Sequence, residues 1–97
     1  MRIAKLIHEQ KEYDLASQLW RSGTSIGANV EESQAAQSRA DFRSKMSIAA
    51  KEARETNYWL RLARDGNVLP ESAVSPCLDE ISEIRKILTS IVKTSSD

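Results

Sequence analysis

The stretch Arg21-Ser-Gly-Thr-Ser-Ile-Gly-Ala-Asn-Val-Glu-Glu32 decides the fold, because it has the composition of a loop but the apolar period of a helix. Its apolar residues stay in phase with those before it and share one side of a helix with 3.6 residues per turn: Leu15, Leu19, Ile26 and Val30. Each glycine in a helix interior costs about 1 kcal/mol relative to alanine. We therefore expect Gly23 and Gly27 to be offset by a gain from small side chains, most simply the close approach of another helix backbone.

The size and charge of the chain restrict what it can be. Its 97 residues make one domain spanning residues 1–97, with 14 Lys and Arg against 14 Asp and Glu. Net charge is therefore zero, and no global field attracts nucleic acid or an anionic membrane. The apolar runs are short, the N-terminus is charged and amphipathic, and Cys77 is the single cysteine. We expect a cytoplasmic protein without a membrane partner.

The chain as a whole indicates an all-α fold. It contains only 3 glycines and 2 prolines, and no alternating strand pattern. Four helices are expected, over residues 1 to about 10, 13–37, 39–65 and from about 76 to 94, before the polar tail 95–97. Short connections between long helices favour an antiparallel up-down four-helix bundle with a short first helix.

Three local signals set the helix boundaries. Ser38-Arg-Ala-Asp41 resembles a capping box with Asp in place of Glu, and predicts the start of the third helix. Gly66-Asn67 predicts a left-handed stop at its end. Residues 70–76 are either a connection or a frayed first turn, with Ser75 as N-cap and Pro76 at the first helical position of the last helix.

Apolar periodicity also predicts the core of the bundle. The stripes of the three long helices point to one set of buried side chains: Leu19, Ile26, Val30, Phe42, Met46, Ala53, Leu60, Ile81, Ile84, Leu88 and Ile91.

Two helices carry a second apolar side. Ile48, Trp59 and Leu62 lie more than about 90° from the core stripe of their helix at 100° per residue, and Trp20 lies on a flank of the second helix. These residues are either exposed rim positions, which are normal for single side chains, or an oligomer interface, which aromatic residues on a second face typically mark. We favour the interface, because so small a chain gains from further burial.

Four segments together resemble a known family: 22–32, Ser38-Arg-Ala-Asp-Phe42, Ala49-Ala-Lys-Glu-Ala-Arg-Glu-Thr56 and Tyr58-Trp-Leu-Arg-Leu62. Across nearly its whole length the chain resembles the 23S rRNA-intervening sequence proteins. The resemblance implies an antiparallel four-helix bundle that assembles into a ring, usually a pentamer. It also implies a fold similar to the accessory variability determinant of diversity-generating retroelements, a ring that binds reverse transcriptase and nucleic acid. No biochemical activity is established for the family.

The chain departs from this family at its start. Family members usually carry a longer first helix, whereas about ten residues precede Lys11-Glu12 here. The first helix is therefore either genuinely short or the product of an internal start.

Candidate catalytic and metal sites fail on residue type and spacing. His8 is the single histidine and Lys5 stands three residues before it, so neither a di-iron set nor a zinc set can form. Cys77 has no basic partner nearby in sequence. Glu52 and Glu55 are more simply solvated or in salt bridges between subunits than a carboxylate site. We therefore expect no catalytic, cofactor-binding or metal-binding residues, and a protein that is not an enzyme.

The third helix has a basic side. Residues 38–65 contain seven basic and four acidic side chains, and Arg43, Arg54 and Arg61 align within about 20° with Tyr58 beside them. Repeated around a ring, this stripe could follow a phosphate backbone. The simpler alternative is a solvated face, or pairing with acidic residues of the last helix: Asp79, Glu80 and Glu83. Two functions remain, a non-enzymatic scaffold or adaptor with a protein partner, and an accessory protein that binds RNA or DNA.

Overall fold

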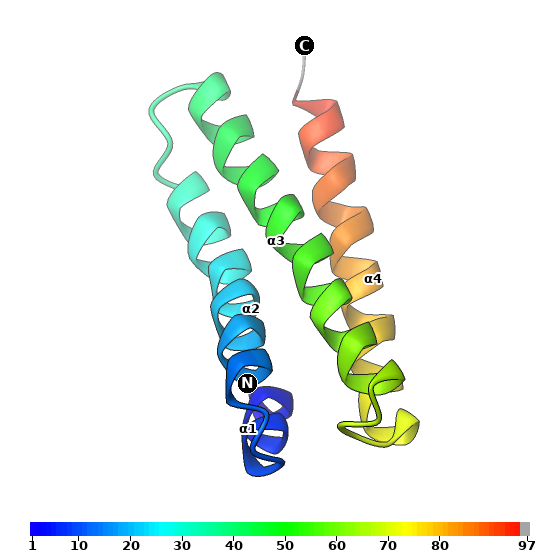
Figure 1. Cartoon of the computed structure of the whole chain (residues 1–97). Coiled ribbons are helices and arrows are strands. Elements are labelled where there is room, and N and C mark those ends of the chain that lie inside the picture. Colours follow the sequence, from blue (N-terminus) through cyan, green and yellow to red (C-terminus); the bar gives the residue numbers. More distant parts are fainter. Residues whose placement is uncertain (96–97) are drawn as a thin grey trace.

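The computed structural model describes residues 1–95, which form four α-helices (Figure 1). In chain order the helices are α1 (Arg2–Glu9), α2 (Tyr13–Ser33), α3 (Arg39–Asp65) and α4 (Glu71–Thr94). No strand occurs in residues 1–95, so the all-α prediction is confirmed. The last two residues of the expected polar tail, Ser96 and Asp97, lie outside the described residues. None of the described helices is long and apolar enough to cross a membrane.

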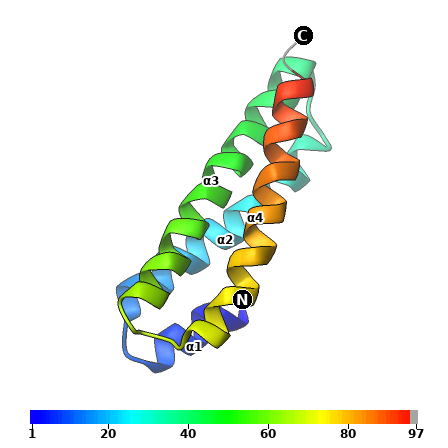
Figure 2. The same cartoon turned by 90° about the vertical axis from the view of Figure 1, so that its right-hand side faces the viewer.

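The three long helices form an up-and-down layer, to which α1 is added at one end. α3 lies in the middle and packs along both α2 and α4 (Figure 1), while α1 packs mainly on α2 and more lightly on α4 (Figure 2). The eight residues of α1 span about 12 Å at 1.5 Å per residue, whereas the molecule is 43 Å long. We call the end that α1 covers the proximal end, and the end with residues 34–38 the distal end.

The α2–α3 connection is longer than expected, because α2 ends at Ser33 and not near Gln37. The Ser33 hydroxyl donates to the Val30 carbonyl oxygen at 2.6 Å, and the side-chain Nε2 of Gln34 donates to the same oxygen at 3.3 Å. Such side-chain bonds compete with continuation of the helix.

The capping motif at the start of α3 is confirmed. Ser38 Oγ accepts from the Asp41 backbone N–H at 3.0 Å, and Asp41 Oδ2 accepts from the Gln37 N–H at 3.4 Å. These bonds satisfy donors that a helix start otherwise leaves free.

Of the two alternatives for residues 70–76, the structure shows the helical one, because α4 begins at Glu71 directly after Pro70. The predicted start with Ser75 as N-cap and Pro76 at the first helical position is therefore wrong. Val74 is fully buried, so residues 71–75 must be helical to bring it to the core. Pro76 consequently lies inside the helix near its start. At the end of α3 the left-handed residue is Asn67, with φ 59°, and Gly66 has φ −82°.

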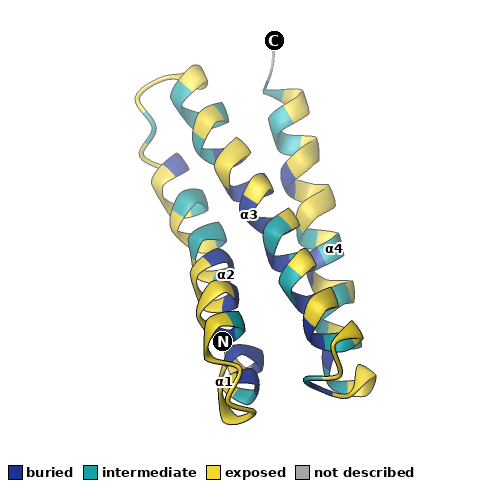
Figure 3. Cartoon of the chain, viewed as in Figure 1, coloured by how far each residue is buried: buried dark blue, intermediate teal, exposed yellow. Residues whose placement is uncertain are grey.

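Burial is densest where α1 covers the long helices, and it continues toward the distal end at Met46 and Leu88. Six predicted core residues are buried: Leu19, Met46, Ala53, Leu60, Ile81 and Leu88. Five others are only partly buried against this core: Ile26, Val30, Phe42, Ile84 and Ile91. Most of the buried positions lie toward the proximal end, and partly buried and exposed positions dominate distally (Figure 3). The periodicity was right about the inward side, but α1 is too short to cover that side along its whole length.

Candidate interaction surfaces

Arg21 on α2 binds two carboxylates on α3. Its Nη1 donates to Glu52 Oε2 at 3.1 Å, and its Nη2 pairs with Glu55 Oε1. Glu55 Oε1 also accepts from Trp59 Nε1 at 3.3 Å. The Glu52 side chain is only 10% exposed. The expectation that these carboxylates are solvated or reserved for another subunit is therefore wrong: they join α2 to α3 within the chain.

A buried hydroxyl pair lies beside this ion pair. The Thr56 hydroxyl donates to the Glu52 carbonyl oxygen at 2.8 Å, and its oxygen lies 2.9 Å from Ser22 Oγ. Ser22 is fully buried, so its small side chain is what lets α2 and α3 approach closely. Of the small residues in the stretch 21–32, Ser22 is therefore the one that allows close packing of α2 against α3.

The two glycines of that stretch do not contact another helix backbone within residues 1–95. A Cβ on Gly23 would meet the Met1 side chain at 2.4 Å, and a Cβ on Gly27 would meet nothing within 4 Å. The predicted close helix packing at Gly23 and Gly27 is therefore not found among residues 1–95. Gly23 provides space for the Met1 thioether, and Gly27 borders open space.

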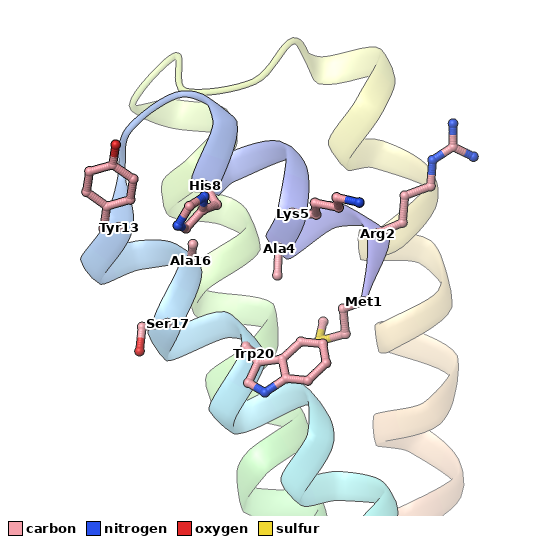
Figure 4. A pocket seen from close by; sticks show the side chains of 9 residues that line it. All are labelled: Met1, Arg2, Ala4, Lys5, His8, Tyr13, Ala16, Ser17 and Trp20. Carbon is pink, nitrogen blue, oxygen red and sulfur yellow. The ribbon is translucent and has the colours of Figure 1, made fainter.

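Trp20 lies in a hollow between α1 and α2. Its side chain and that of Met1 border the same end of this hollow, which has a volume of ≈ 770 Å³ and continues past Ala4 and Ala16 to Tyr13 (Figure 4). Trp20 is 53% exposed.

The other three predicted interface residues lie on a different side of the molecule. Trp59 and Leu62 border a second hollow, shared with Leu15 and Gln18 at the α2–α3 junction. Ile48 and Leu62 are 39% and 43% exposed, while Trp59 is partly buried against the core. The structure therefore brings Trp59 and Leu62 together and places Trp20 on the α1 side of α2. The four residues do not form a single patch on one chain.

The basic stripe runs along α3. Arg54 and Tyr58 are exposed, and the guanidinium carbon of Arg61 lies 5.9 Å from the Tyr58 ring centroid. Arg61 Nε also donates to Asn57 Oδ1 at 2.8 Å, while Arg43 is only partly exposed. The ion pairs found within residues 1–95 do not join Arg54 or Arg61 to an acidic residue of α4.

Glu80 is one of the acidic residues of α4 that the sequence offered as partners for the basic stripe. Glu80 borders a hollow that faces α1 and α2, together with Cys77 and Ile84. Burial, reinforced by the Glu80 carboxylate, raises the pKa of the Cys77 thiol, which disfavours the nucleophilic thiolate. In the part of the chain that the structure describes, no three His, Cys, Asp or Glu residues are placed to hold a metal ion.

Sequence reasoning missed two features of these surfaces. It assigned no role to Arg21, although two carboxylates spaced i, i+3 on a neighbouring helix call for a counter-charge. It also placed Ile26, Val30, Phe42, Ile84 and Ile91 in the core, although a first helix of eight residues does not cover helices of more than twenty along their whole length.

Three long antiparallel helices with a short helix packed at one end define an all-helical protein of four helices over residues 1–95. The chain matches the model of the 23S rRNA-intervening sequence protein family over residues 1–90, and belongs to that family.

A solved relative supports the assignment. A protein of unknown function from the S23 ribosomal protein family of Bacteroides thetaiotaomicron is 45% identical, with a TM-score of 0.90 over 95% of this chain and 86% of that chain. None of the curated proteins matches this chain significantly. The expected similarity to the retroelement accessory determinant stays a prediction.

Proposed function

We propose that this protein is a cytoplasmic, non-enzymatic scaffold or adaptor that works as a homo-oligomer, with a pentameric ring as the form its family resemblance implies. The observation that carries the proposal is the exposure of large apolar side chains away from the core. Ile48 and Leu62 are 39% and 43% exposed on α3, and Trp20 is 53% exposed on α2.

The placement of these residues suits a ring better than a two-fold dimer. The Trp20 surface and the Ile48–Leu62 surface lie on different sides of one chain. A contact between two different surfaces is head-to-tail, and such contacts close into rings when the rotation permits. Each subunit would then bury its Trp20 surface against the Ile48–Leu62 surface of its neighbour.

Light scattering coupled to size exclusion, at tens of micromolar protein, tests self-association. Leu62→Glu should reduce the measured mass toward that of one chain, because a charge would be buried in the contact. Ser47→Glu adds the same charge at another exposed position of α3 and should leave the mass unchanged. A parent protein that runs as a monomer would refute the oligomer.

A second function rests on the basic stripe, which combines exposed Arg54 and Arg61 with an aromatic ring that is 49% exposed at Tyr58. In this alternative the protein binds RNA or DNA through phosphate contacts, with stacking on the ring. Gel shifts with mixed-sequence RNA and duplex DNA over a salt series test it.

Binding through phosphates should be nearly independent of sequence, and log K should fall by about 0.7–0.9 per log unit of salt for each phosphate neutralised. Arg54→Glu with Arg61→Glu should abolish it. Lys86→Glu with Lys93→Glu makes the same charge change on exposed positions of α4 and serves as the control. If no complex forms even at low salt, the adaptor function alone survives.

A further inference from the structure

Two hollows lie on opposite sides of the first turns of α2. Four residues of α2 border the hollow between α1 and α2: Tyr13, Ala16, Ser17 and Trp20. Three others border the hollow at the α2–α3 junction: Asp14, Leu15 and Gln18. At 100° per residue the two sets are centred about 160° apart around the helix axis. The two hollows therefore face away from each other at the same level of the molecule.

The hollow between α1 and α2 has a basic rim, and we call it the basic hollow. Arg2, Lys5 and His8 of α1 border it, and no acidic residue within residues 1–95 does. The His8 ring meets the Tyr13 ring edge-on, with ring centroids 4.8 Å apart (Figure 4). Arg2 and Lys5 are exposed, and the ion pairs found in the described part of the chain include neither of them. Both charges are therefore available to an anionic partner.

The hollow at the α2–α3 junction has an acidic rim, and we call it the acidic hollow. Its volume is ≈ 620 Å³, and the charged residues that border it are Glu12 and Asp14. Both are exposed, and no ion pair found within residues 1–95 includes either of them. Trp59 and Leu62 supply apolar surface beside them. An apolar surface with an acidic edge suits a partner that presents aromatic side chains next to Lys or Arg.

The basic hollow of a second copy of the chain has these properties. The rings of Tyr13 and Trp20 border it and are 54% and 53% exposed, so they can enter the hollow of a neighbour. Lys5 borders the same hollow from α1. Contact between two basic hollows, or between two acidic hollows, would instead place like charges opposite each other, which weakens binding. Charge therefore favours a head-to-tail contact over either two-fold contact.

We propose that the basic hollow of one subunit binds the acidic hollow of the next, and that their opposite charges select this pairing. The proposal rests on the self-association put forward above and specifies its partner surfaces, Arg2 and Lys5 against Glu12 and Asp14. These charges lie at the rims, so they set the orientation of the subunits. The apolar residues between the rims supply the buried surface of the contact.

Charge reversal on one hollow at a time tests the contact. The mass of the assembly is measured by light scattering behind size exclusion at about 0.1 M salt, where charges act over about 10 Å. Arg2→Glu with Lys5→Glu makes both hollows acidic, and Glu12→Lys with Asp14→Lys makes both basic. Each double variant should weaken association by about tenfold or more, and its mass should fall toward that of one chain.

Two recoveries show that the charges act as a pair. The four changes combined exchange the signs of the two hollows, so this variant should regain the parent mass. A mixture of the two double variants in equal amounts should also associate, because the acidic hollows of one variant match the basic hollows of the other. Neither recovery is expected if the substitutions act only by disturbing the helices that carry them.

Matched controls carry the same changes in net charge elsewhere. Lys86→Glu with Lys93→Glu, and Asp79→Lys with Glu83→Lys, alter exposed positions of α4 and should leave the mass unchanged. Circular dichroism at 222 nm checks that each variant is folded. Lys5→Glu or Glu12→Lys alone replaces a double variant that loses its helical signal, and should reduce the mass in the same direction.

Two results would overturn the proposal: a folded double variant that keeps the parent mass, or a folded combined variant that stays dissociated. A loss of mass in the first double variant alone would indicate a two-fold contact through the basic hollow. A parent oligomer that Leu62→Glu dissociates but the charge reversals do not refutes the charge pairing and leaves self-association standing. A monomeric parent refutes self-association itself, and the pairing with it.

Discussion

Replacing Arg21 with methionine should destabilise the fold by leaving the Glu52 carboxylate buried without its counter-charge. The Glu52 side chain is 10% exposed, and its Oε2 lies 3.1 Å from Arg21 Nη1. Methionine keeps much of the length of the arginine side chain, so packing changes little while the charge is lost. Glu55, the second carboxylate on the same guanidinium, is more exposed at 29% and can turn to solvent.

The expected cost is about 2 kcal/mol, because breaking a fully buried pair costs about 3–5 kcal/mol and Arg21 is itself 49% exposed. For a domain of this size, 2 kcal/mol corresponds to a drop in melting temperature of about 10 °C. The double variant Arg21→Met with Glu52→Leu should recover most of this loss, because an apolar pair of similar size replaces a buried ion pair at little cost.

Urea unfolding followed by circular dichroism at 222 nm measures the effect. Arg64→Met is the matched control, because Arg64 pairs with its neighbour Asp65 at the surface, and it should leave the midpoint unchanged. A single variant as stable as the parent, or a double variant no better than the single, would contradict the assigned role of Arg21.

Three further predictions concern single positions. Gly27→Ala should raise the unfolding free energy by about 1 kcal/mol, because the added Cβ enters open space. Gly66→Ala should instead lower the melting temperature, because the added Cβ would lie 2.9 Å from the Leu62 carbonyl oxygen. Thermal melts of the two variants and the parent check both expectations. Thr56→Val should cost about 1–2 kcal/mol in urea unfolding, because it removes a buried hydroxyl pair. The free energy of unfolding should also fall as the pH rises above 9.0, the ordinary pKa of a thiol. The raised pKa of Cys77 keeps its proton bound in the folded state after the unfolded chain has released it. In thermal melts over a pH series, Cys77→Ala should remove this contribution to the fall in melting temperature.

Local chemistry predicted the fold well where it acts over a few residues. Ser38 and Asp41 mark the start of α3 through bonds that span three and four positions, and such bonds depend little on the rest of the chain. The start of α4 depended instead on a distant partner, the core that buries Val74. Proline at a helix start is a strong local signal, and here burial outweighed it.

The candidate surfaces were less predictable, because periodicity places a residue on its own helix but does not fix how two helices are rotated together. Trp20 and Trp59 each lie off the core stripe as expected, yet they face different hollows. The same limit hid Arg21, whose partners stand 31 and 34 residues away. Predicting either feature requires the angle between α2 and α3, which no short motif carries.

The unequal cover that α1 gives the long helices has a consequence for motion. Amide protons near Leu19 and Leu60 are sheltered by a closed core, so their exchange with solvent requires the whole protein to unfold. Val30 and Phe42 are only partly buried, so a local opening is enough for the amide protons near them to exchange with solvent. The distal end can therefore open locally while the more completely buried core at the proximal end keeps the fold in place.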